Sequence, residues 1–181
     1  KKEKIYRAEL GTERMIYSEM VGREQELDRL QLHLVKLING EGSIISVMGE
    51  AGIGKSRLVA EFRRKDEINR VTLLEGRALS IGQNLSFHPI IDIFKSWSGI
   101  KEEDSETESL NKLEKAIRSI DPEGAEEIFP FIATLMGMKL SGKYAERVKG
   151  IEGEALERLI LKNLRELIIK ATVQKPLVLI M

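Results

Sequence analysis

The sequence predicts a three-layer α/β domain built on a parallel sheet. A short apolar run at residues 43–48 is rich in β-branched side chains and leads into a glycine-rich turn and the helical pattern of residues 56–65. A second strand candidate follows at residues 71–75. The interval between the two runs is what a strand–helix–strand crossover requires. Strands joined in this way lie parallel in one sheet.

The composition is that of an ordinary globular protein. Hydrophobic residues make up 42% of the 181 and charged residues 32%, and 29 Lys and Arg balance 29 Asp and Glu. This balance gives no support to a general nucleic-acid-binding surface. The absence of cysteine excludes disulfides, thiolate zinc sites and cysteine nucleophiles. No apolar run spans a bilayer and no signal peptide begins the chain, so we expect a cytoplasmic protein without a membrane partner.

Both ends of the sequence have the character of cuts. The chain begins with Lys1 rather than Met, and the apolar run at residues 177–181 has no following turn. Residues 1–19 have no sustained apolar period and predict a leader or linker. We expect residues 20–181 to form the N-terminal part of one domain that is truncated at its C-terminus.

The helical patterns before and after the second strand follow in order. Residues 24–38 carry apolar side chains at helical spacing and end at a stop signal, which predicts an amphipathic helix. A polar loop at residues 76–89 precedes a helix that starts near Pro89 and runs through Trp97, which we expect to pack. The acidic residues 101–108 predict an exposed loop, with a flexible insertion as the alternative.

The second half of the chain predicts more helices and a last strand. Patterns at residues 110–120 and about 124–136 indicate a helical insertion over about residues 100–150. A long amphipathic pattern at residues 150–172 predicts a helix that ends before a Lys-Pro pair. The last strand, residues 176–181, begins there, so we expect at least three strands in the sheet.

A phosphate-binding motif follows the first predicted strand. The segment from Gly49 to Ser56 matches G-x-x-x-x-G-K-[ST] at every fixed position, between a predicted strand and a predicted helix. Gly49, Gly52 and Gly54 allow positive φ, so successive N–H groups can point at phosphate oxygens beside the positive end of the helix dipole. Lys55 can reach the β- and γ-phosphates, and the Ser56 hydroxyl can ligate Mg²⁺. The sequence therefore predicts a site for a nucleoside triphosphate with Mg²⁺.

The other residues of the motif region complete the predicted cofactor-binding set. Glu50, Ala51 and Ile53 occupy the variable positions, and we assign them no chemistry beyond fitting the loop. Arg57 comes directly after the motif, and we expect its side chain to face elsewhere. The predicted chemistry therefore rests on the glycines, the lysine and the serine.

The segment Met20-Val21-Gly22-Arg23-Glu24, followed by a helix and then GEAGIGKS, resembles the start of STAND-type and related AAA+ ATPase domains. Such domains are fused in many bacterial proteins to adenylate cyclase, kinase or transcription-regulator modules. In that family the V-G-R-E segment lies against the adenine and ribose. The resemblance therefore implies that Val21, Gly22 and Arg23 contact ATP or ADP. The alternative is that Val21 and Gly22 only start the helix and that Arg23 is solvated.

The resemblance also implies the AAA+/STAND type of P-loop fold, here truncated. It covers residues 71–97 and resumes with the long helix, whereas residues 100–150 match less clearly. The strand at residues 176–181 is similar to the Walker B strand, whose acidic end orders Mg²⁺ and polarises the attacking water. The sequence stops before those acids, so we do not expect efficient hydrolysis by this chain.

No catalytic residue is assigned from the sequence. Glu75, at the end of the second predicted strand, is the carboxylate that could approach the water site, with a solvated or capping role as the alternative. His33 and His88 have no partners at ligand spacing, which indicates packing or surface roles rather than a metal site.

Three functions remain open at this point. The first is an ATPase switch in which ATP and ADP favour different domain arrangements and so control a fused output module or a protein partner. The second is a non-hydrolysing nucleotide-binding scaffold whose long helix and insertion contact a partner. The third, a small-molecule kinase, needs an acceptor site and lid arginines, and the V-G-R-E segment argues against it.

Overall fold

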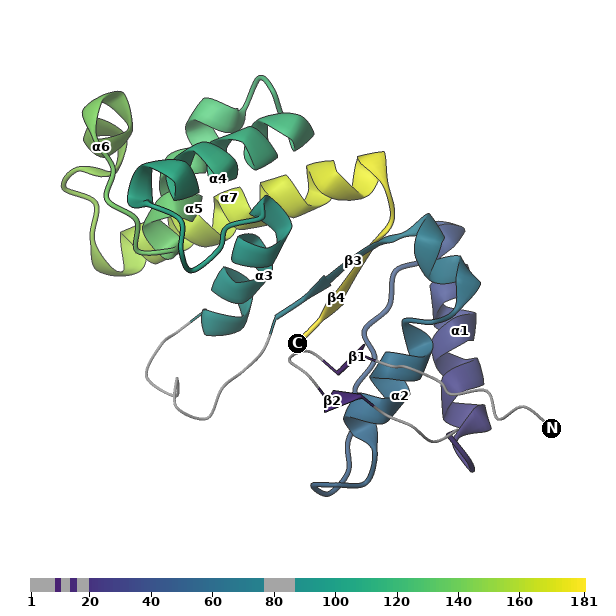
Figure 1. Ribbon diagram of the computed structural model, residues 1–181. Helices are drawn as coiled ribbons and strands as arrows, with labels where there is room; N and C mark the ends of the chain where they lie inside the picture. Colours follow the sequence, from purple (N-terminus) through teal and green to yellow (C-terminus); the bar gives the residue numbers. More distant parts are fainter. Residues whose placement is uncertain (1–8, 11–13, 16–19, 77–86) are drawn as a thin grey trace. The chain divides into compact units, whose positions relative to one another are not determined.

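The chain divides into two compact units, residues 1–72 and residues 73–181, which we call the loop unit and the helical unit. The computed structural model describes residues 9–10, 14–15, 20–76 and 87–181. Its helices and strands are labelled in Figure 1. Most of the predicted leader and of the predicted polar loop at residues 76–89 lies outside the described residues. The predicted domain boundary after residue 19 stays a prediction.

Two α-helices are the longest elements described in the loop unit. Its elements are the antiparallel strands β1 (Glu9–Leu10) and β2 (Arg14–Met15), α1 (Glu24–Ile38), α2 (Lys55–Phe62) and the 3-10 helix η1 (Asp66–Arg70). α1 begins and ends at the predicted residues, and it lies against α2 and η1. It buries Leu34, of which 2% is exposed. The amphipathic helix predicted from spacing is therefore confirmed.

The predicted first strand is not observed in this structure. Residues 43–48 connect α1 to the glycine-rich turn without forming a strand, and they leave Ile44 100% and Met48 87% exposed. A β-branched run becomes a strand only where a neighbouring strand takes its hydrogen bonds and covers its side chains. Among the described residues, the only sheets are the β1–β2 hairpin and a pair formed by β3 and β4. The predicted sheet of at least three strands is therefore not observed.

The helical unit contains most of the remaining elements. In chain order they are β3 (Thr72–Glu75) at the unit boundary, α3 (His88–Ser98), α4 (Glu106–Ile120), α5 (Ala125–Leu135), α6 (Gly142–Val148), α7 (Gly153–Gln174) and β4 (Leu177–Ile180). β3 and β4 pair in parallel, and the N–H of Gly76 donates to the carbonyl of Ile180 over 2.9 Å. This pairing confirms that the second and last predicted strands lie parallel in one sheet.

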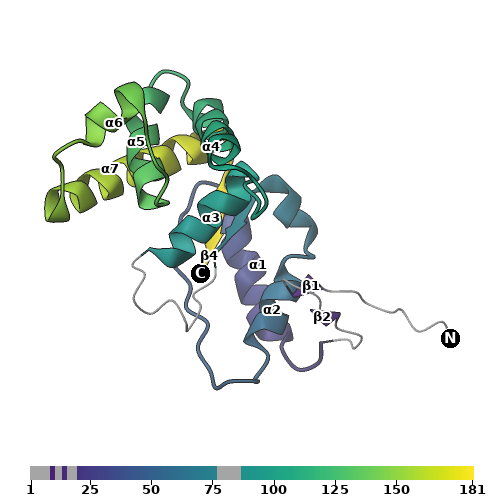
Figure 2. The same ribbon diagram turned by 60° about the vertical axis from the view of Figure 1, so that its left-hand side comes forward.

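A hydrophobic core forms where α5 packs against α4 and α7 (Figures 1 and 2). Leu113, Ile117 and Ile132 are 0% exposed there. Trp97 packs edge-on against Phe94 with ring centroids 5.6 Å apart, which confirms its packing role. No described helix has a stretch long and apolar enough to cross a membrane.

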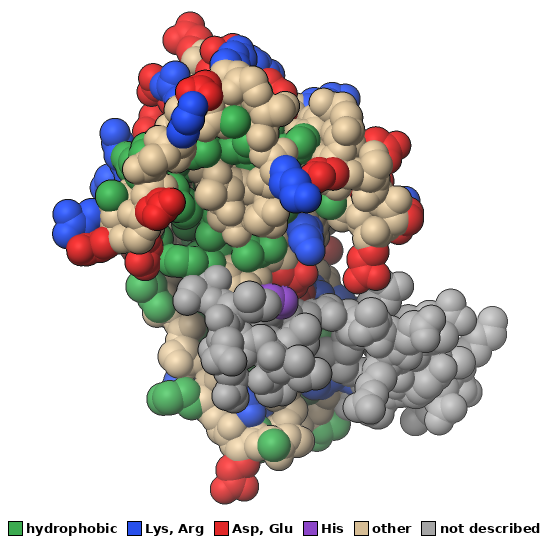
Figure 3. Space-filling view, turned by 90° about the vertical axis from the view of Figure 1, so that its left-hand side faces the viewer, with side chains coloured by type: hydrophobic (Ala, Val, Ile, Leu, Met, Phe, Trp, Pro, Cys, Tyr) green, Lys and Arg blue, Asp and Glu red, His purple; other side chains and the backbone are tan. Residues whose placement is uncertain are grey.

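Helices form in the region of the predicted insertion, with two differences from the predicted elements. α6 has no counterpart among the predicted helices. The predicted acidic loop ends at Ser105 rather than at residue 108, because Ser105 and Glu108 form a reciprocal capping box that starts α4. Figure 3 shows positive and negative side chains interspersed on one face of the molecule. Lys143 and Glu126 form an ion pair in the helical unit.

Candidate functional site

The predicted phosphate loop turns through glycines that have positive φ angles. Gly52 has a φ of 82° and Gly54 of 101°, and Gly54 is the N-cap residue of α2. Apart from the adjoining backbone, nothing lies within 4 Å of the position that a Cβ would take on either glycine. The positive φ angles favour glycine at both positions.

A side chain approaches Gly49 closely. A Cβ on Gly49 would come within 2.9 Å of the Cγ2 atom of Ile53, so the Ile53 side chain would have to shift to admit one. The variable residue Ile53 therefore folds back over the first glycine of the loop.

Lys55 closes the loop from the first turn of α2. Its Nζ atom donates to the carbonyl of Gly49 over 2.7 Å and to the carbonyl of Glu50 over 2.9 Å. The ammonium is thus held directly over the loop. Ser56 follows on α2 and is exposed, so its hydroxyl is accessible. Charge-assisted bonds to phosphate oxygens are stronger than bonds to neutral carbonyls, so an anion can compete for the ammonium.

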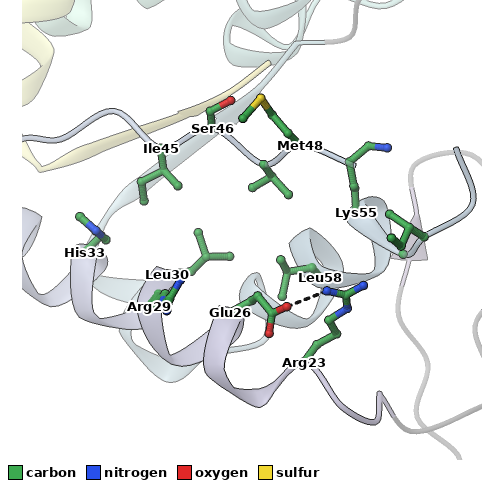
Figure 4. A pocket seen from close by; sticks show the side chains of 13 residues that line it. Arg23, Glu26, Arg29, Leu30, His33, Ile45, Ser46, Met48, Lys55 and Leu58 are labelled. Atoms are coloured by element: carbon green, nitrogen blue, oxygen red, sulfur yellow. Dashed lines mark hydrogen bonds and ion pairs between the residues drawn. The ribbon is translucent and has the colours of Figure 1, made fainter. Parts of the chain in front are cut away.

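A pocket of about 300 Å³ lies beside this loop, within the loop unit (Figure 4). One side is a face of α1, and the other is the segment at residues 45–48 together with the start of α2. Apolar walls with a few polar groups are typical of small-molecule sites. The lining residues are Arg23, Glu26, Arg29, Leu30, His33, Ile45, Ser46, Val47, Met48, Ile53, Gly54, Lys55 and Leu58.

The structure brings one residue of the V-G-R-E segment into this pocket. Arg23 lines it together with Lys55 and Gly54 (Figure 4). Val21 is 83% exposed and does not line the pocket. Gly22 has a φ of 77°, and its N–H donates to Glu24 over 3.1 Å. Arg23 and Lys55 are therefore the two predicted cations that share the site.

Two other predicted residues lie elsewhere. Arg57 forms an ion pair of 2.6 Å with Glu61, one turn further along α2, and it does not line the pocket. This agrees with the expectation that its side chain faces elsewhere, although it stood in the predicted cofactor-binding set. Glu75 ends β3, and a catalytic role for it stays a prediction.

Sequence reasoning missed three charged or polar contributors on α1. Glu26, Arg29 and His33 line the pocket with Arg23, because steps of three and four residues place them on one helical face. The Nδ1 atom of His33 lies 3.0 Å from the Ser43 hydroxyl oxygen. The helical spacing was present in the sequence, but it did not indicate that this face turns toward the phosphate loop.

One ion pair joins two residues that line the pocket. Arg23 Nη1 donates to Glu26 Oε1 over 2.6 Å. This hydrogen bond, helped by a backbone N–H, lowers the pKa of the Glu26 carboxyl below its ordinary value. Glu26 is therefore ionised at neutral pH, and the pair adds no net charge to a site that also holds Lys55.

Comparisons with known proteins identify a family and a curated relative. The family described as AAA ATPase domain matches residues 19–181. An uncharacterized curated protein of Rhizobium meliloti (strain 1021) is 33% identical over 98 residues, which is 50% of this chain and 10% of that protein. The matched part thus spans about a tenth of that relative's length. No solved structure matches the chain significantly. Because the family match covers nearly all of the described residues, the chain belongs to the AAA ATPase domain family, and this membership indicates nucleotide binding.

Proposed function

We propose that this chain is the Mg-ATP-binding part of a nucleotide-dependent switch domain of the STAND type. One observation carries the proposal. The Lys55 ammonium is held over the glycine turn by the carbonyls of Gly49 and Glu50, beside a pocket that Arg23 also lines. Two cations and a turn of open, positive-φ glycines are a suitable receptor for a polyphosphate with an organic group attached.

The residues of the loop fit the phosphates and Mg²⁺. The turn at Gly52 and Gly54 leads directly into α2, so an anion bound there meets the backbone N–H groups at the start of that helix. In the proposal, Lys55 moves from the loop carbonyls to phosphate oxygens and Ser56 offers its hydroxyl to Mg²⁺. ATP supplies the phosphoryl group, and Mg²⁺ neutralises charge on it when bound. The chain's own residues bind and orient the phosphates.

Arg23 extends the proposed site toward the base and ribose. Its place in the pocket and the apolar walls around it support contact with the nucleoside, as the V-G-R-E resemblance implies. Val21 and Gly22 complete that proposed contact, and the exposure of Val21 leaves it accessible. We place the domain in the cytoplasm, where ATP and Mg²⁺ are available.

We also propose that residues 43–48 add a strand to a three-layer P-loop sheet. The support is the apolar, β-branched segment, whose Ile44 is fully exposed in the structure. Ile44→Ala tests this proposal. A strand covered on both faces predicts a loss of about 2 kcal/mol or more in unfolding free energy, and a change within about 0.5 kcal/mol contradicts it.

A non-hydrolysing scaffold is the second candidate function. α7 exposes Leu161, Ile169 and Val173, of which 43%, 46% and 83% is accessible, and such a face is suited to a protein partner. Phosphate release distinguishes the candidates. The switch predicts turnover in the whole protein, and the scaffold predicts stable nucleotide binding without it.

The decisive experiment is titration with a fluorescent ATP analogue, with and without Mg²⁺. We expect Lys55→Ala to weaken binding about 30-fold or more, which corresponds to about 2 kcal/mol for a lost charge contact. The matched control is Lys36→Ala, because Lys36 is exposed in the last turn of α1. Equal binding by the wild type and Lys55→Ala, or no binding by the wild type, would contradict the proposal.

A further inference from the structure

The pocket contains a carboxylate that a polyphosphate site does not obviously need. Among the described residues that line it, Glu26 is the only acid, alongside Arg23, Arg29 and Lys55. A carboxylate near a ligand with several negative charges lowers affinity by like-charge repulsion unless a cation neutralises it. The presence of Glu26 therefore calls for a physical reason.

The contact between Glu26 and Arg23 provides a physical reason for the carboxylate. Arg23 is the N-cap residue of α1, with φ −130° and ψ 21°, and thus lies at the helix end. Its Nη1 atom meets Glu26 Oε1 over 2.6 Å, three residues along. The two side chains are 41% and 39% exposed. This contact holds the long, partly exposed side chain of Arg23 in one orientation.

The pair leaves the guanidinium able to bind a ligand. A guanidinium has five N–H donors in a planar fork, and the contact recorded with Glu26 uses Nη1. Figure 4 shows the pair within the same pocket as Lys55. Ordering a flexible side chain before binding removes part of the entropy cost of binding.

We propose that Glu26 is a positioning residue that holds the Arg23 guanidinium in the pocket for the bound nucleotide. The proposal rests on the proposed nucleotide-binding function. Glu26 acts through Arg23 and contacts no ligand itself. Its own charge is offset by the same contact, so the polyphosphate does not meet an unpaired anion.

A double-mutant cycle tests this role. The affinity for the fluorescent Mg-ATP analogue is measured for the wild type, Arg23→Ala, Glu26→Gln and the double variant. We expect Glu26→Gln to weaken binding about fivefold, within the range of coupling between contacting residues, and Arg23→Ala to weaken it at least as much. The double variant should bind as Arg23→Ala does. The control is Asp28→Asn, because Asp28 is exposed on α1 and does not line the pocket.

The outcomes separate this proposal from the function on which it rests. If the losses of affinity in the two single variants multiply in the double variant, Glu26 acts independently of Arg23. That result would overturn the positioning role and leave the proposed nucleotide binding intact. Tighter binding by Glu26→Gln would overturn it too, since Glu26 would then keep Arg23 from the nucleotide. No binding by the wild type would overturn both proposals. If Glu26→Gln does not fold by circular dichroism, Glu26→Asp replaces it in the cycle, with the same non-additivity expected.

Discussion

The helical unit and the loop unit differ in how well they cover their apolar side chains. In the helical unit Leu113 and Ile132 are 0% exposed. In the loop unit Ile44 is 100%, Met48 87% and Leu32 55% exposed. The part of the chain with the proposed ligand site is thus the part whose own packing is less complete.

The difference in exposure arises from the number of apolar helix faces that pack together in each unit. α5 contacts α4, α6 and α7, so several amphipathic faces share one core. In the loop unit α1 packs against α2 and the short 3-10 helix η1, so fewer apolar faces meet there. Binding loops are commonly drawn from regions of low local stability. The comparison therefore predicts that substitutions in the helical unit affect stability more than matched substitutions in the loop unit.

The largest effect is expected for leucines truncated in the two units. Leu113→Ala removes a fully buried side chain from α4 and should lower the unfolding free energy by about 2–5 kcal/mol. Leu32→Ala removes an exposed side chain from α1 and should change it by less than about 0.5 kcal/mol. Urea denaturation followed by circular dichroism measures both. Similar losses for the two variants would show that α1 is covered in solution and would remove the contrast between the units.

Elements specified by local signals could be predicted, and those that depend on distant partners could not. α1 follows the prediction at both ends, because helical spacing and the stop signal lie within the segment itself. The run at residues 43–48 has strand composition, but a strand also requires a neighbouring strand, which a local pattern does not provide. The start of α4 could have been found, because Ser105 and Glu108 have the spacing of a capping box.

The candidate site shows the same difference between features set by local sequence and features set by distant contacts. The motif predicted the loop, and the positive φ angles of Gly52 and Gly54 are confirmed. The contribution of Glu26 was missed, because it depends on which face of α1 turns toward the loop in the folded chain. The nucleotide contacts of Val21, Gly22 and Arg23 and the role of Glu75 stay predictions, since no ligand contact tests them.

A partly buried ion pair gives the second largest expected effect and sharpens the comparison within the helical unit. Lys170 on α7 donates to Asp121, whose side chain is 9% exposed and also accepts from the N–H of Gly124 over 3.1 Å. Lys170→Ala leaves that carboxylate buried beside one donor. We expect a loss of about 1–3 kcal/mol in unfolding free energy at pH 7, less than for a fully buried pair because Lys170 is 39% exposed.

The pH dependence of this loss follows from the Asp121 carboxyl. The hydrogen bond from Lys170 lowers the pKa of Asp121 in the folded state below its ordinary value of 3.8. The stabilisation is therefore complete above the unfolded pKa and is lost as the pH falls through the folded one. The difference in unfolding free energy between the wild type and Lys170→Ala, measured by urea titration, should therefore be smaller at pH 3 than at pH 7. Lys162→Ala, an exposed change on the same helix, is the control, and a gap that does not change with pH would contradict the assignment.

The smallest effect is expected at the exposed start of α4. Ser105 Oγ accepts from the N–H of Glu108 over 3.3 Å, and the Glu108 carboxylate accepts from the N–H of Ser105 over 2.9 Å. Ser105→Ala removes one arm of this box and should lower the unfolding free energy by about 1 kcal/mol. Faster amide exchange in the first turn of α4 would locate the change. Ser119→Ala on the same helix should cost nothing, because the Ser119 hydroxyl donates within the helix, to the Ala116 carbonyl, and alanine is the better helix former. Equal losses for the two serines would contradict the capping role.

The same variant also tests whether the two units are independent. Since the cap lies in the helical unit, the affinity for the ATP analogue should stay unchanged in Ser105→Ala. A changed affinity would mean that the two units do not fold independently.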